Sequence, residues 1–173
     1  MSHTNQPACW VVMGVSGCGK SEIGQRLATA LGLPFLEGDS FHSAANVAKM
    51  AAGIALTDDD RAGWLHTLQE HIRQATAHGH GLVLSCSALK RRYRDLLRAG
   101  NPALRFAHLS GPRSVIAERM AARVNHYMPP SLLDSQLRDL EPLQADEAGV
   151  LLDLNLPPQQ LVEAILDNQG ARA

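Results

Sequence analysis

Residues 14–21, with the sequence GVSGCGKS, match the phosphate-binding loop pattern G-x-x-x-x-G-K-[ST] at every fixed position. Glycines let such a loop turn tightly and direct successive backbone N–H groups at an anion. The lysine adds a positive charge for the β- and γ-phosphates of a nucleotide, and the serine hydroxyl is a ligand for Mg²⁺. The pattern therefore predicts that ATP and Mg²⁺ are bound by Gly14, Val15, Ser16, Gly17, Cys18, Gly19, Lys20 and Ser21.

The residues around this loop have the pattern of a strand followed by a helix. Residues 9–13 (CWVVM) form a short apolar run, which is typical of a buried parallel strand. After the loop, Ile23, Leu27 and Leu31 recur every four residues, and Gly32 stands where a helix commonly ends. This order of strand, loop and helix is the one that phosphate binding requires, whereas a loop without function leaves the adjacent lysine and serine unexplained.

Two carboxylates, Glu37 and Asp39, follow the second apolar run of the sequence. Side chains one residue apart on an extended segment point to the same side. Beside a bound magnesium–ATP complex, one carboxylate is suited to hold a metal-bound water and the other to accept a proton from an attacking hydroxyl. The alternative is a pair of acids in an ordinary turn.

Four further side chains are candidates for binding a small substrate. His42 can donate to a substrate hydroxyl as a neutral imidazole, or it is simply an exposed histidine at a helix start. Arg61 can pair with a substrate anion or with Asp58 on its own helix turn. Lys90 and Arg94 lie on the first turns of a predicted helix, where cations oppose the helix dipole unless an anion is present, so we expect them to bind substrate.

Arg119 and Arg123 lie one helical turn apart and lead into residues 121–133, a polar, proline-marked segment that we interpret as a mobile lid. Guanidinium groups there can stack on adenine or bind the transferred phosphate. The alternatives are a solvated helix face and an ordinary surface loop. For Cys18 we favour a small side chain packed under the phosphate-binding loop over a reactive thiol.

Five predicted strands alternate with predicted helices and indicate an α/β fold. Such alternation is typical of a parallel sheet with helices on both faces, in which ligands bind beyond the carboxyl ends of the strands. The predicted strands are residues 9–13, 34–37, 81–86, 104–109 and 150–154. The main helices predicted after the first are residues 43–52, a helix from residue 57, and residues 88–98, 112–120, 131–141 and 158–167. Residues 1–173 are long enough for one such domain.

Composition excludes several classes of function. The net charge is −1 and no basic block stands out, so we expect no nucleic-acid partner. The first residues lack the charged and apolar regions of a signal peptide, and no apolar stretch is long enough to span a membrane, so we expect no membrane partner. Three cysteines without C-x-x-C spacing favour neither a disulfide framework nor a zinc site. A reducing, cytoplasmic location fits these features.

At this point the sequence resembles a known family, the gluconokinases, which are similar to shikimate and adenylate kinases. The resemblance covers nearly the whole chain, and its narrowest segments are DDDRAGWL at residues 58–65 and CSALK at residues 86–90. The other matching segments are residues 13–21, 38–42, 46–50, 91–98, 126–127, 135–143 and 150–154. One departure is Ser43, because the family often has proline after the histidine at this position.

The resemblance implies ATP-dependent phosphorylation of D-gluconate at its terminal hydroxyl, which makes the chain a phosphotransferase and gives 6-phosphogluconate. It implies a P-loop kinase fold, a five-stranded parallel sheet of order 2-3-1-4-5 with a lid, and a homodimer. Asp39 matches the acid that faces the substrate hydroxyl. Glu37 stands where shikimate kinases have the first of two aspartates, and we expect it to serve the metal through a water. Arg61 matches an arginine for the substrate carboxylate, and Arg123 resembles a lid arginine. The expected catalytic set consists of Lys20, Asp39 and Arg123.

Two other functions remain open at this stage. One is a kinase of the same fold that acts on another small anion, such as shikimate. The other is a nucleotide-dependent switch without a small substrate, which would need effector-facing loops that respond to the γ-phosphate. The narrow segments at residues 58–65 and 86–90 argue against the first, and no feature of the sequence marks a partner surface for the second.

Overall fold

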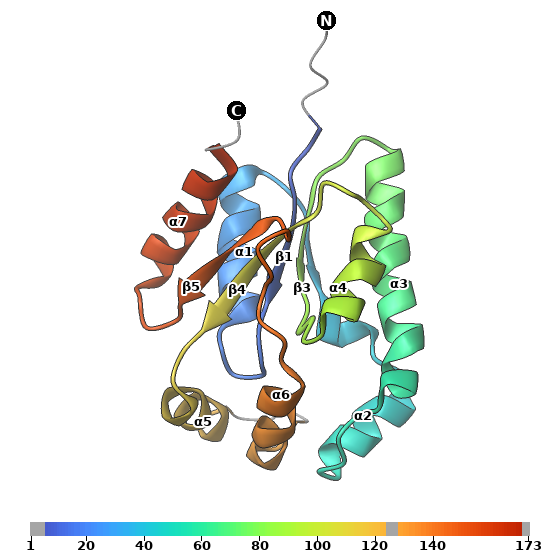
Figure 1. Ribbon diagram of the computed structural model, residues 1–173, viewed down its shortest axis with the longest axis vertical. Coiled ribbons are helices and arrows are strands. Elements are labelled where there is room, and N and C mark those ends of the chain that lie inside the picture. Colours follow the sequence, from blue (N-terminus) through green and yellow to red (C-terminus); the bar gives the residue numbers. More distant parts are fainter. Residues whose placement is uncertain (1–5, 124–127, 171–173) are drawn as a thin grey trace, which may run out of the picture.

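The computed structural model describes residues 6–123 and 128–170 and contains one five-stranded sheet, ordered β2-β3-β1-β4-β5 (Figure 1). All four strand pairings are parallel, which confirms the predicted order and fold. The strands are β1 (Cys9–Met13), β2 (Phe35–Glu37), β3 (Leu82–Ser85), β4 (Arg105–Ser110) and β5 (Gly149–Asp153).

Strand β1 lies at the centre of the sheet because its sequence is apolar throughout. All five of its residues are buried, as a strand covered on both faces requires. It pairs with β3 on one side and β4 on the other, so that Val11 faces Leu84 and Phe106. This placement puts the loop after β1 in the middle of the carboxyl edge of the sheet, where ligands bind in such folds.

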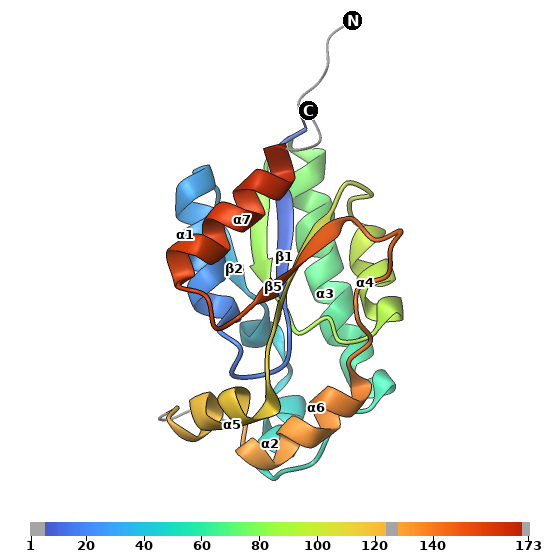
Figure 2. The ribbon, with the colours of Figure 1, turned by 60° about the vertical axis from the view of Figure 1, so that its left-hand side comes forward.

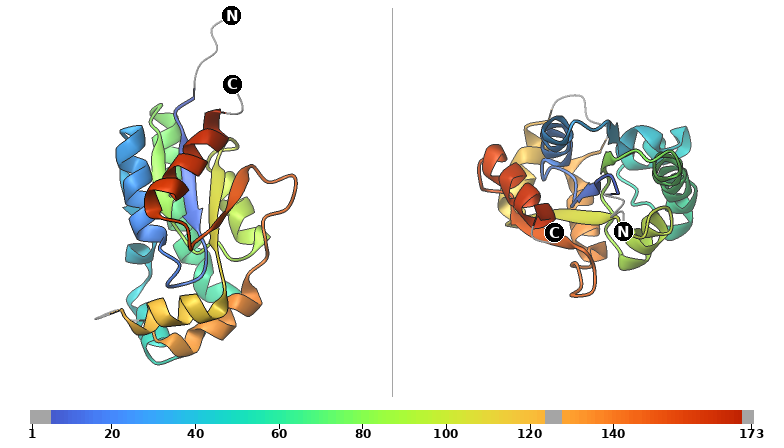
Figure 3. Two further views of the ribbon diagram at one scale, coloured as in Figure 1. Left: turned by 90° about the vertical axis from the view of Figure 1, so that its left-hand side faces the viewer. Right: turned by 90° about the horizontal axis from the view of Figure 1, so that it is seen from above.

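Helices cover both faces of the sheet and its carboxyl end. In Figure 2, α1 and α7 lie on one side of the strands and α3 and α4 on the other. Helices α2, α5 and α6 lie together beyond the carboxyl ends of the strands (Figures 1 and 3). The helices are α1 (Lys20–Leu31), α2 (Ala44–Ala51), α3 (Asp58–Ala77), α4 (Arg91–Arg98), α5 (Arg113–Ala121), α6 (Leu133–Asp139) and α7 (Pro158–Gly170), with short 3-10 helices at Gly38–Phe41 and Pro130–Leu132.

Sequence signals set the ends of several helices. Helix α1 ends at Gly32, whose φ of 66° is in the left-handed region that glycine adopts readily. Helix α3 begins with a capping box, in which the side chains of Thr57 and Asp60 each accept a backbone N–H from the other residue. Such caps satisfy N–H groups that have no partner within the helix.

Several predicted helix boundaries were wrong, including the end of the last helix, which was predicted at residue 167 and lies at Gly170. The helix predicted over residues 88–98 begins only at Arg91, because Ala88 has a φ of 45° and cannot continue into a right-handed helix. Pro112 precedes α5 instead of lying in its first turn. The helix predicted over residues 131–141 is divided into the 3-10 turn at Pro130–Leu132 and the short helix α6, which ends at Asp139.

The three cysteines are unpaired and buried, as expected for a chain without a disulfide framework. Burial raises the pKa of Cys9 and of Cys86 to about 12. Cys18 lies under the phosphate-binding loop, as we favoured, with 1% of its surface exposed. Within residues 6–123 and 128–170, no helix has both the length and the apolar character needed to cross a membrane.

Candidate active site

The phosphate-binding loop joins the end of β1 to the first turn of α1. Gly14, Gly17 and Gly19 have φ values of 146°, 83° and 96°, which residues with a Cβ rarely adopt. A Cβ at Gly14 would lie 2.7 Å from both the sulfur of Cys18 and the carbonyl oxygen of Leu109. The loop is therefore closely packed from below, and the first N–H groups of α1, which have no partner within the helix, are available to an anion.

A cavity of about 240 Å³, here named the loop cavity, opens beside this loop. Its lining combines glycines, cations and acids: Gly17, Gly19, Lys20, Ser21, Glu22, Asp39, Arg119 and Arg123. The ammonium of Lys20 donates to the carbonyl oxygen of Val15 at 3.0 Å, which keeps the charge against the loop. Backbone N–H groups and three cations around one cavity are suited to the phosphates of a nucleotide.

The two predicted arginines reach the loop cavity from α5 and from the residues that follow it. Nη1 of Arg123 donates to the hydroxyl of Ser16 at 2.9 Å, and Nη2 of Arg119 donates to the carbonyl oxygen of Leu154 at 3.1 Å. Both arginines therefore lie beside the phosphate-binding loop, and their contacts with phosphates stay a prediction. Of the predicted lid, residues 124–127 lie outside the described residues, so the motion of the segment over residues 121–133 stays a prediction.

A second cavity, the side cavity, lies next to the first and has a volume of about 230 Å³. Its lining includes Gly17, Cys18 and Arg119, the apolar Leu154 and Leu156 of the segment between β5 and α7, and Pro158 and Leu161 of α7. Sequence reasoning missed these apolar residues. A signal was present, because Leu156 is an apolar, exposed residue in the loop after the last strand, at the edge of the sheet where ligands bind.

The two residues predicted to serve a metal, Ser21 and Glu37, contact each other, and Ser21 lines the loop cavity. The hydroxyl of Ser21 donates to Oε2 of Glu37, and the hydroxyl of Ser85 donates to Oε1 at 2.7 Å. Mg²⁺ prefers oxygen ligands, retains several waters and is commonly held by one or two protein groups and substrate phosphates. The donor set of Ser21, Glu37 and nearby Asp39 fits such an ion. Ser85 was not predicted, although it directly faces Glu37 across the strand pair.

A third cavity, the inner cavity, is narrow, at about 20 Å³, and shares Lys20 and Asp39 with the loop cavity. Its other polar lining residues are Ser16, His42, Arg61, Ser87 and Gln136, and its apolar ones are Met50, Leu56, Trp64 and Met128. Two of the predicted substrate residues, His42 and Arg61, therefore lie beside Asp39. The inner cavity has the cation, hydroxyl and amide groups that a small polar anion needs.

His42 stacks on Trp64 with ring centroids 4.1 Å apart and an interplanar angle of 17°. The indole N–H of Trp64 donates to the carbonyl oxygen of Gly38 at 2.8 Å, and this hydrogen bond fixes the indole ring on which the imidazole stacks. Burial lowers the pKa of His42, against the opposing charge of Asp39, and the charge of Arg61 lowers it further. The imidazole is therefore neutral at neutral pH, the form in which it both donates and accepts hydrogen bonds.

Arg61 points from α3 into the inner cavity with 7% of its surface exposed. Its Nη1 donates to the hydroxyl of Tyr93 at 2.9 Å and to Oδ2 of Asp139 at 3.3 Å. The alternative pairing with Asp58 does not occur, because Asp58 is bonded by Lys90 and Tyr93 instead. Arg61 is thus held in place from two other helices while it faces the cavity.

Lys90 does not line any of these three cavities. Its ammonium donates to Asp58 at 3.0 Å, and this hydrogen bond raises the pKa of Lys90. The dipole argument correctly required an anion near this helix start, but the anion is the chain's own Asp58. A substrate contact of Lys90 has no support in this geometry.

Arg94 was predicted to bind substrate, and its position contradicts this prediction. The residue is 0% exposed, and its guanidinium pairs with Glu147 and with backbone carbonyl groups. All of its N–H groups donate to acceptors within the protein. The prediction for Arg94 was therefore wrong, because the anion that pairs with it, Glu147, lies far away in the sequence.

Gln136 is a further residue that sequence reasoning missed. Its Oε1 accepts the backbone N–H of Ser16 at 2.6 Å, and the residue lines the inner cavity. It therefore joins α6 to the phosphate-binding loop. A single buried glutamine within a short helix gives no local signal of this contact.

Comparisons with known proteins identify the family. Residues 9–143 match the family described as AAA domain. A gluconokinase from Gluconobacter oxydans is 44% identical over 93% of this chain and 90% of its own length. Among solved structures, an unliganded sugar kinase from Janibacter sp. HTCC2649 is 49% identical with a TM-score of 0.89, over 96% of this chain and 98% of that one. A gluconokinase from Sinorhizobium meliloti is 46% identical with a TM-score of 0.86, over 97% of this chain and 94% of that one.

These relatives are similar over nearly the full length of both chains. The chain belongs to the gluconokinase family of P-loop kinases.

Proposed function

We propose that this chain catalyses the ATP-dependent phosphorylation of D-gluconate at its terminal hydroxyl to give 6-phospho-D-gluconate. The observation that carries the proposal is that the loop cavity and the inner cavity meet at Lys20 and Asp39. A phosphoryl donor in one cavity and an alcohol in the other would face each other there, as in-line transfer requires. The relatives named gluconokinase point to a sugar acid as the alcohol.

The loop cavity would hold ATP. The N–H groups of the phosphate-binding loop and Lys20 would bind the β- and γ-phosphates, while Arg123 and Arg119 approach from α5 and the residues after it. The side cavity, with Leu156 and Pro158, would take the base. Ser21 would hold Mg²⁺ directly and Glu37 through water, and the ion would neutralise charge that develops on the phosphates.

Asp39 is the residue best placed to act on the acceptor hydroxyl. Phosphoryl transfer passes through a loose transition state, so the attacking hydroxyl needs little deprotonation early in the reaction. The main work of the carboxylate would be to orient the hydroxyl, with proton acceptance late in the step.

The inner cavity, whose volume of about 20 Å³ suits roughly one water, would widen to admit gluconate and would recognise it by its charge and its hydroxyl groups. Arg61, held by Tyr93 and Asp139, would pair with the carboxylate, and neutral His42 would bond a hydroxyl. A site built to bond such groups rejects analogues that lack them, because its buried polar atoms are then left unpaired.

A coupled assay of ADP release over D-gluconate, D-glucose, shikimate and no acceptor tests this function. We expect turnover with gluconate and little with glucose, which has no carboxylate for Arg61. Lys20→Met should lower kcat/KM by at least about a hundredfold and serves as the control that activity belongs to this site. Equal rates on gluconate and glucose would contradict the proposed anion role, and ADP release that needs no acceptor would favour a nucleotide-dependent switch.

A single domain over residues 1–173, a lid over about residues 121–133, a homodimer and a cytoplasmic location remain proposals. They are supported by the length and composition of the chain and by the resemblance to the family.

A further inference from the structure

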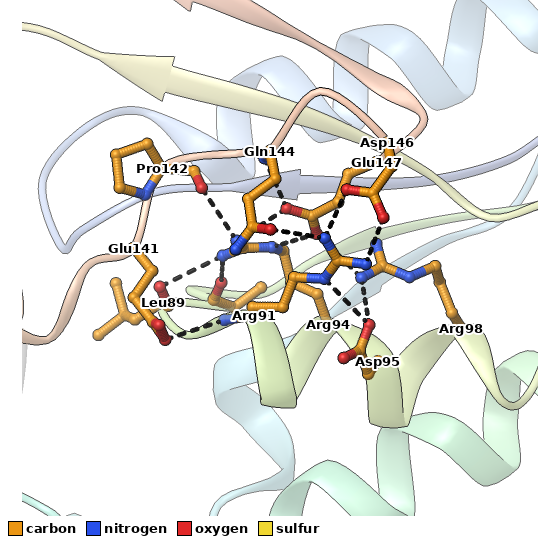
Figure 4. Close-up of polar contacts among 11 residues, drawn as sticks. Leu89, Arg91, Arg94, Asp95, Arg98, Glu141, Pro142, Gln144, Asp146 and Glu147 are labelled. Atoms are coloured by element: carbon orange, nitrogen blue, oxygen red, sulfur yellow. Dashed lines mark hydrogen bonds and ion pairs between the residues drawn. The ribbon is translucent and has the colours of Figure 1, made fainter.

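A buried ion pair, Arg94 with Glu147, lies outside the three cavities (Figure 4). Nε of Arg94 donates to Oε1 of Glu147 at 2.7 Å and Nη2 donates to Oε2 at 3.0 Å, a bidentate arrangement. Both side chains are completely buried. A buried ion pair seldom adds more stability than apolar side chains of the same size would, so its geometry is the property to explain.

The remaining N–H groups of Arg94 are bonded to the backbone of two segments. Nη1 donates to the carbonyl oxygens of Ala88 at 2.9 Å and Leu89 at 3.2 Å, and Nη2 donates to that of Pro142 at 3.3 Å. The guanidinium thus joins the loop between β3 and α4 to the segment between α6 and β5, as the dashed lines to Leu89 and Pro142 in Figure 4 show. Lysine could not make this set of contacts, because it lacks the planar fork.

Ala88, one of the residues bonded in this way, has a strained backbone. Its φ of 45° is the only positive φ of a non-glycine residue in the described part of the chain. Such a conformation persists only where the surroundings enforce it. The hydrogen bonds from Arg94 to Ala88 and its neighbour Leu89 supply that enforcement.

The strained residue directly follows Ser87, which lines the inner cavity. The carbonyl oxygen of Ser87 also accepts the N–H of Gly14, the first residue of the phosphate-binding loop, at 3.3 Å. A change in the conformation of Ala88 would therefore move a wall of the inner cavity and its junction with the phosphate-binding loop.

We infer that Arg94 and Glu147 are positioning residues that hold the loop after β3 in its strained form and thereby set the affinity of the inner cavity for its acceptor. This role rests on the proposed function. It replaces the direct substrate contact predicted for Arg94 from the sequence, and it gives Glu147 a part in recognition although it lies in none of the cavities.

The first test compares Arg94→Lys with Arg91→Lys on the intact chain. Arg91 is on the same helix and pairs with exposed Asp146, so it controls for loss of an arginine from α4 (Figure 4). Arg94→Lys should raise KM for gluconate about tenfold and leave KM for ATP unchanged. This effect is smaller than the roughly hundredfold loss of rate that a misplacement of about 1 Å can cause. Arg91→Lys should leave both constants unchanged. Glu147→Gln, which keeps the size of the side chain, should act like Arg94→Lys and serves if that variant does not fold.

The second test asks whether the effect passes through Ala88. Ala88→Gly makes the left-handed conformation accessible without strain, so it should restore much of the gluconate affinity of Arg94→Lys while changing that of the unsubstituted chain little. The same double-mutant cycle, measured as shifts of the urea midpoint, should show that Ala88→Gly stabilises the unsubstituted chain more than it stabilises Arg94→Lys, because the loop of Arg94→Lys relaxes and leaves little strain for glycine to relieve.

Two results would overturn the inference: an unchanged KM for gluconate in folded Arg94→Lys, or equal effects of Ala88→Gly in both backgrounds. Absence of gluconate-dependent ADP release in the unsubstituted chain would instead contradict the proposed function. In that case the double-mutant cycle measured by urea unfolding still decides whether Arg94 holds Ala88, since unfolding needs no substrate.

Discussion

The loop cavity and the inner cavity share Lys20 and Asp39, yet they are built in different ways. Four of the residues around the loop cavity are contiguous, Gly19 to Glu22, and the cavity measures about 240 Å³. The inner cavity measures about 20 Å³ and draws residues from segments spread between Ser16 and Gln136. In the proposed function, phosphates would be bound by a local backbone conformation, whereas the acceptor would be bound by side chains that only tertiary packing brings together.

The two cavities also differ in how their charges are held. Lys20 in the loop cavity contacts a single carbonyl oxygen, so its charge is available to an incoming phosphate. Arg61 in the inner cavity is bonded by Tyr93 and Asp139, residues from α4 and α6. The acceptor side therefore has its shape imposed by neighbouring helices, and substitutions there should separate acceptor binding from nucleotide binding.

The largest effect is expected at Asp39, which lines both cavities. Asp39→Asn keeps the shape and one acceptor oxygen but removes the charge, and should lower kcat by about 10²–10⁴-fold with ATP affinity little changed. Turnover and nucleotide binding are measured on one preparation, with Glu22→Gln, an exposed acid of the loop cavity, as the control. Loss of ATP binding with near-normal turnover at saturating ATP would place Asp39 in the metal site and Glu37 at the acceptor hydroxyl.

A smaller effect is expected where α4 supports Arg61. Tyr93→Phe removes the hydroxyl that accepts from Arg61 and donates to Asp58, and should raise KM for gluconate about fivefold, the range of one net hydrogen bond. KM for ATP should not change. Steady-state kinetics with each substrate varied measure this, with Arg73→Gln on the exposed face of α3 as the control. An equal rise in both constants would show that the cavities are not separable.

The smallest effect is expected on stability, and it concerns the protonation of Glu147. Burial alone would raise the pKa of this carboxyl, but hydrogen bonds from Arg94, the N–H of Gln144 and Arg98 outweigh it and lower the pKa from 4.5 to about 2. Because the folded pKa lies below the unfolded one, Glu147 should stabilise the fold fully above about pH 4.5 and lose this contribution as pH falls to about 2.

Urea unfolding of the unsubstituted chain and of Glu147→Gln over this range measures the contribution. Nearby His108, whose pKa is lowered to about 4 by burial and then by the charge of Arg94, titrates in both proteins, so the difference between them isolates Glu147. The variant should show the flatter pH dependence. Parallel curves would mean that the carboxyl is not held as an ion by these partners.

The same contrast explains what could be predicted from the sequence. The phosphate-binding loop, the strand order and the positions of Asp39 and Arg61 followed from fixed spacings within short segments or from family resemblance. Arg94 was misjudged for two reasons. The left-handed Ala88 delays the start of α4, and the partner carboxylate, Glu147, comes from a segment beyond α6 that is distant in the sequence. Gln136 and Ser85 escaped notice for the same reason, since their contacts join elements distant in the chain.

The burial of the three cysteines has a practical consequence for following nucleotide binding. Cys9 and Cys86 hold almost no thiolate at neutral pH, and Cys18 is shielded beneath the phosphate-binding loop, so none competes well for a thiol-reactive dye. A fluorophore attached through Glu118→Cys, on the exposed face of α5 beside Arg119, would label one site without prior removal of native thiols. The protein is thus suited to single-site spectroscopy in its otherwise unmodified form.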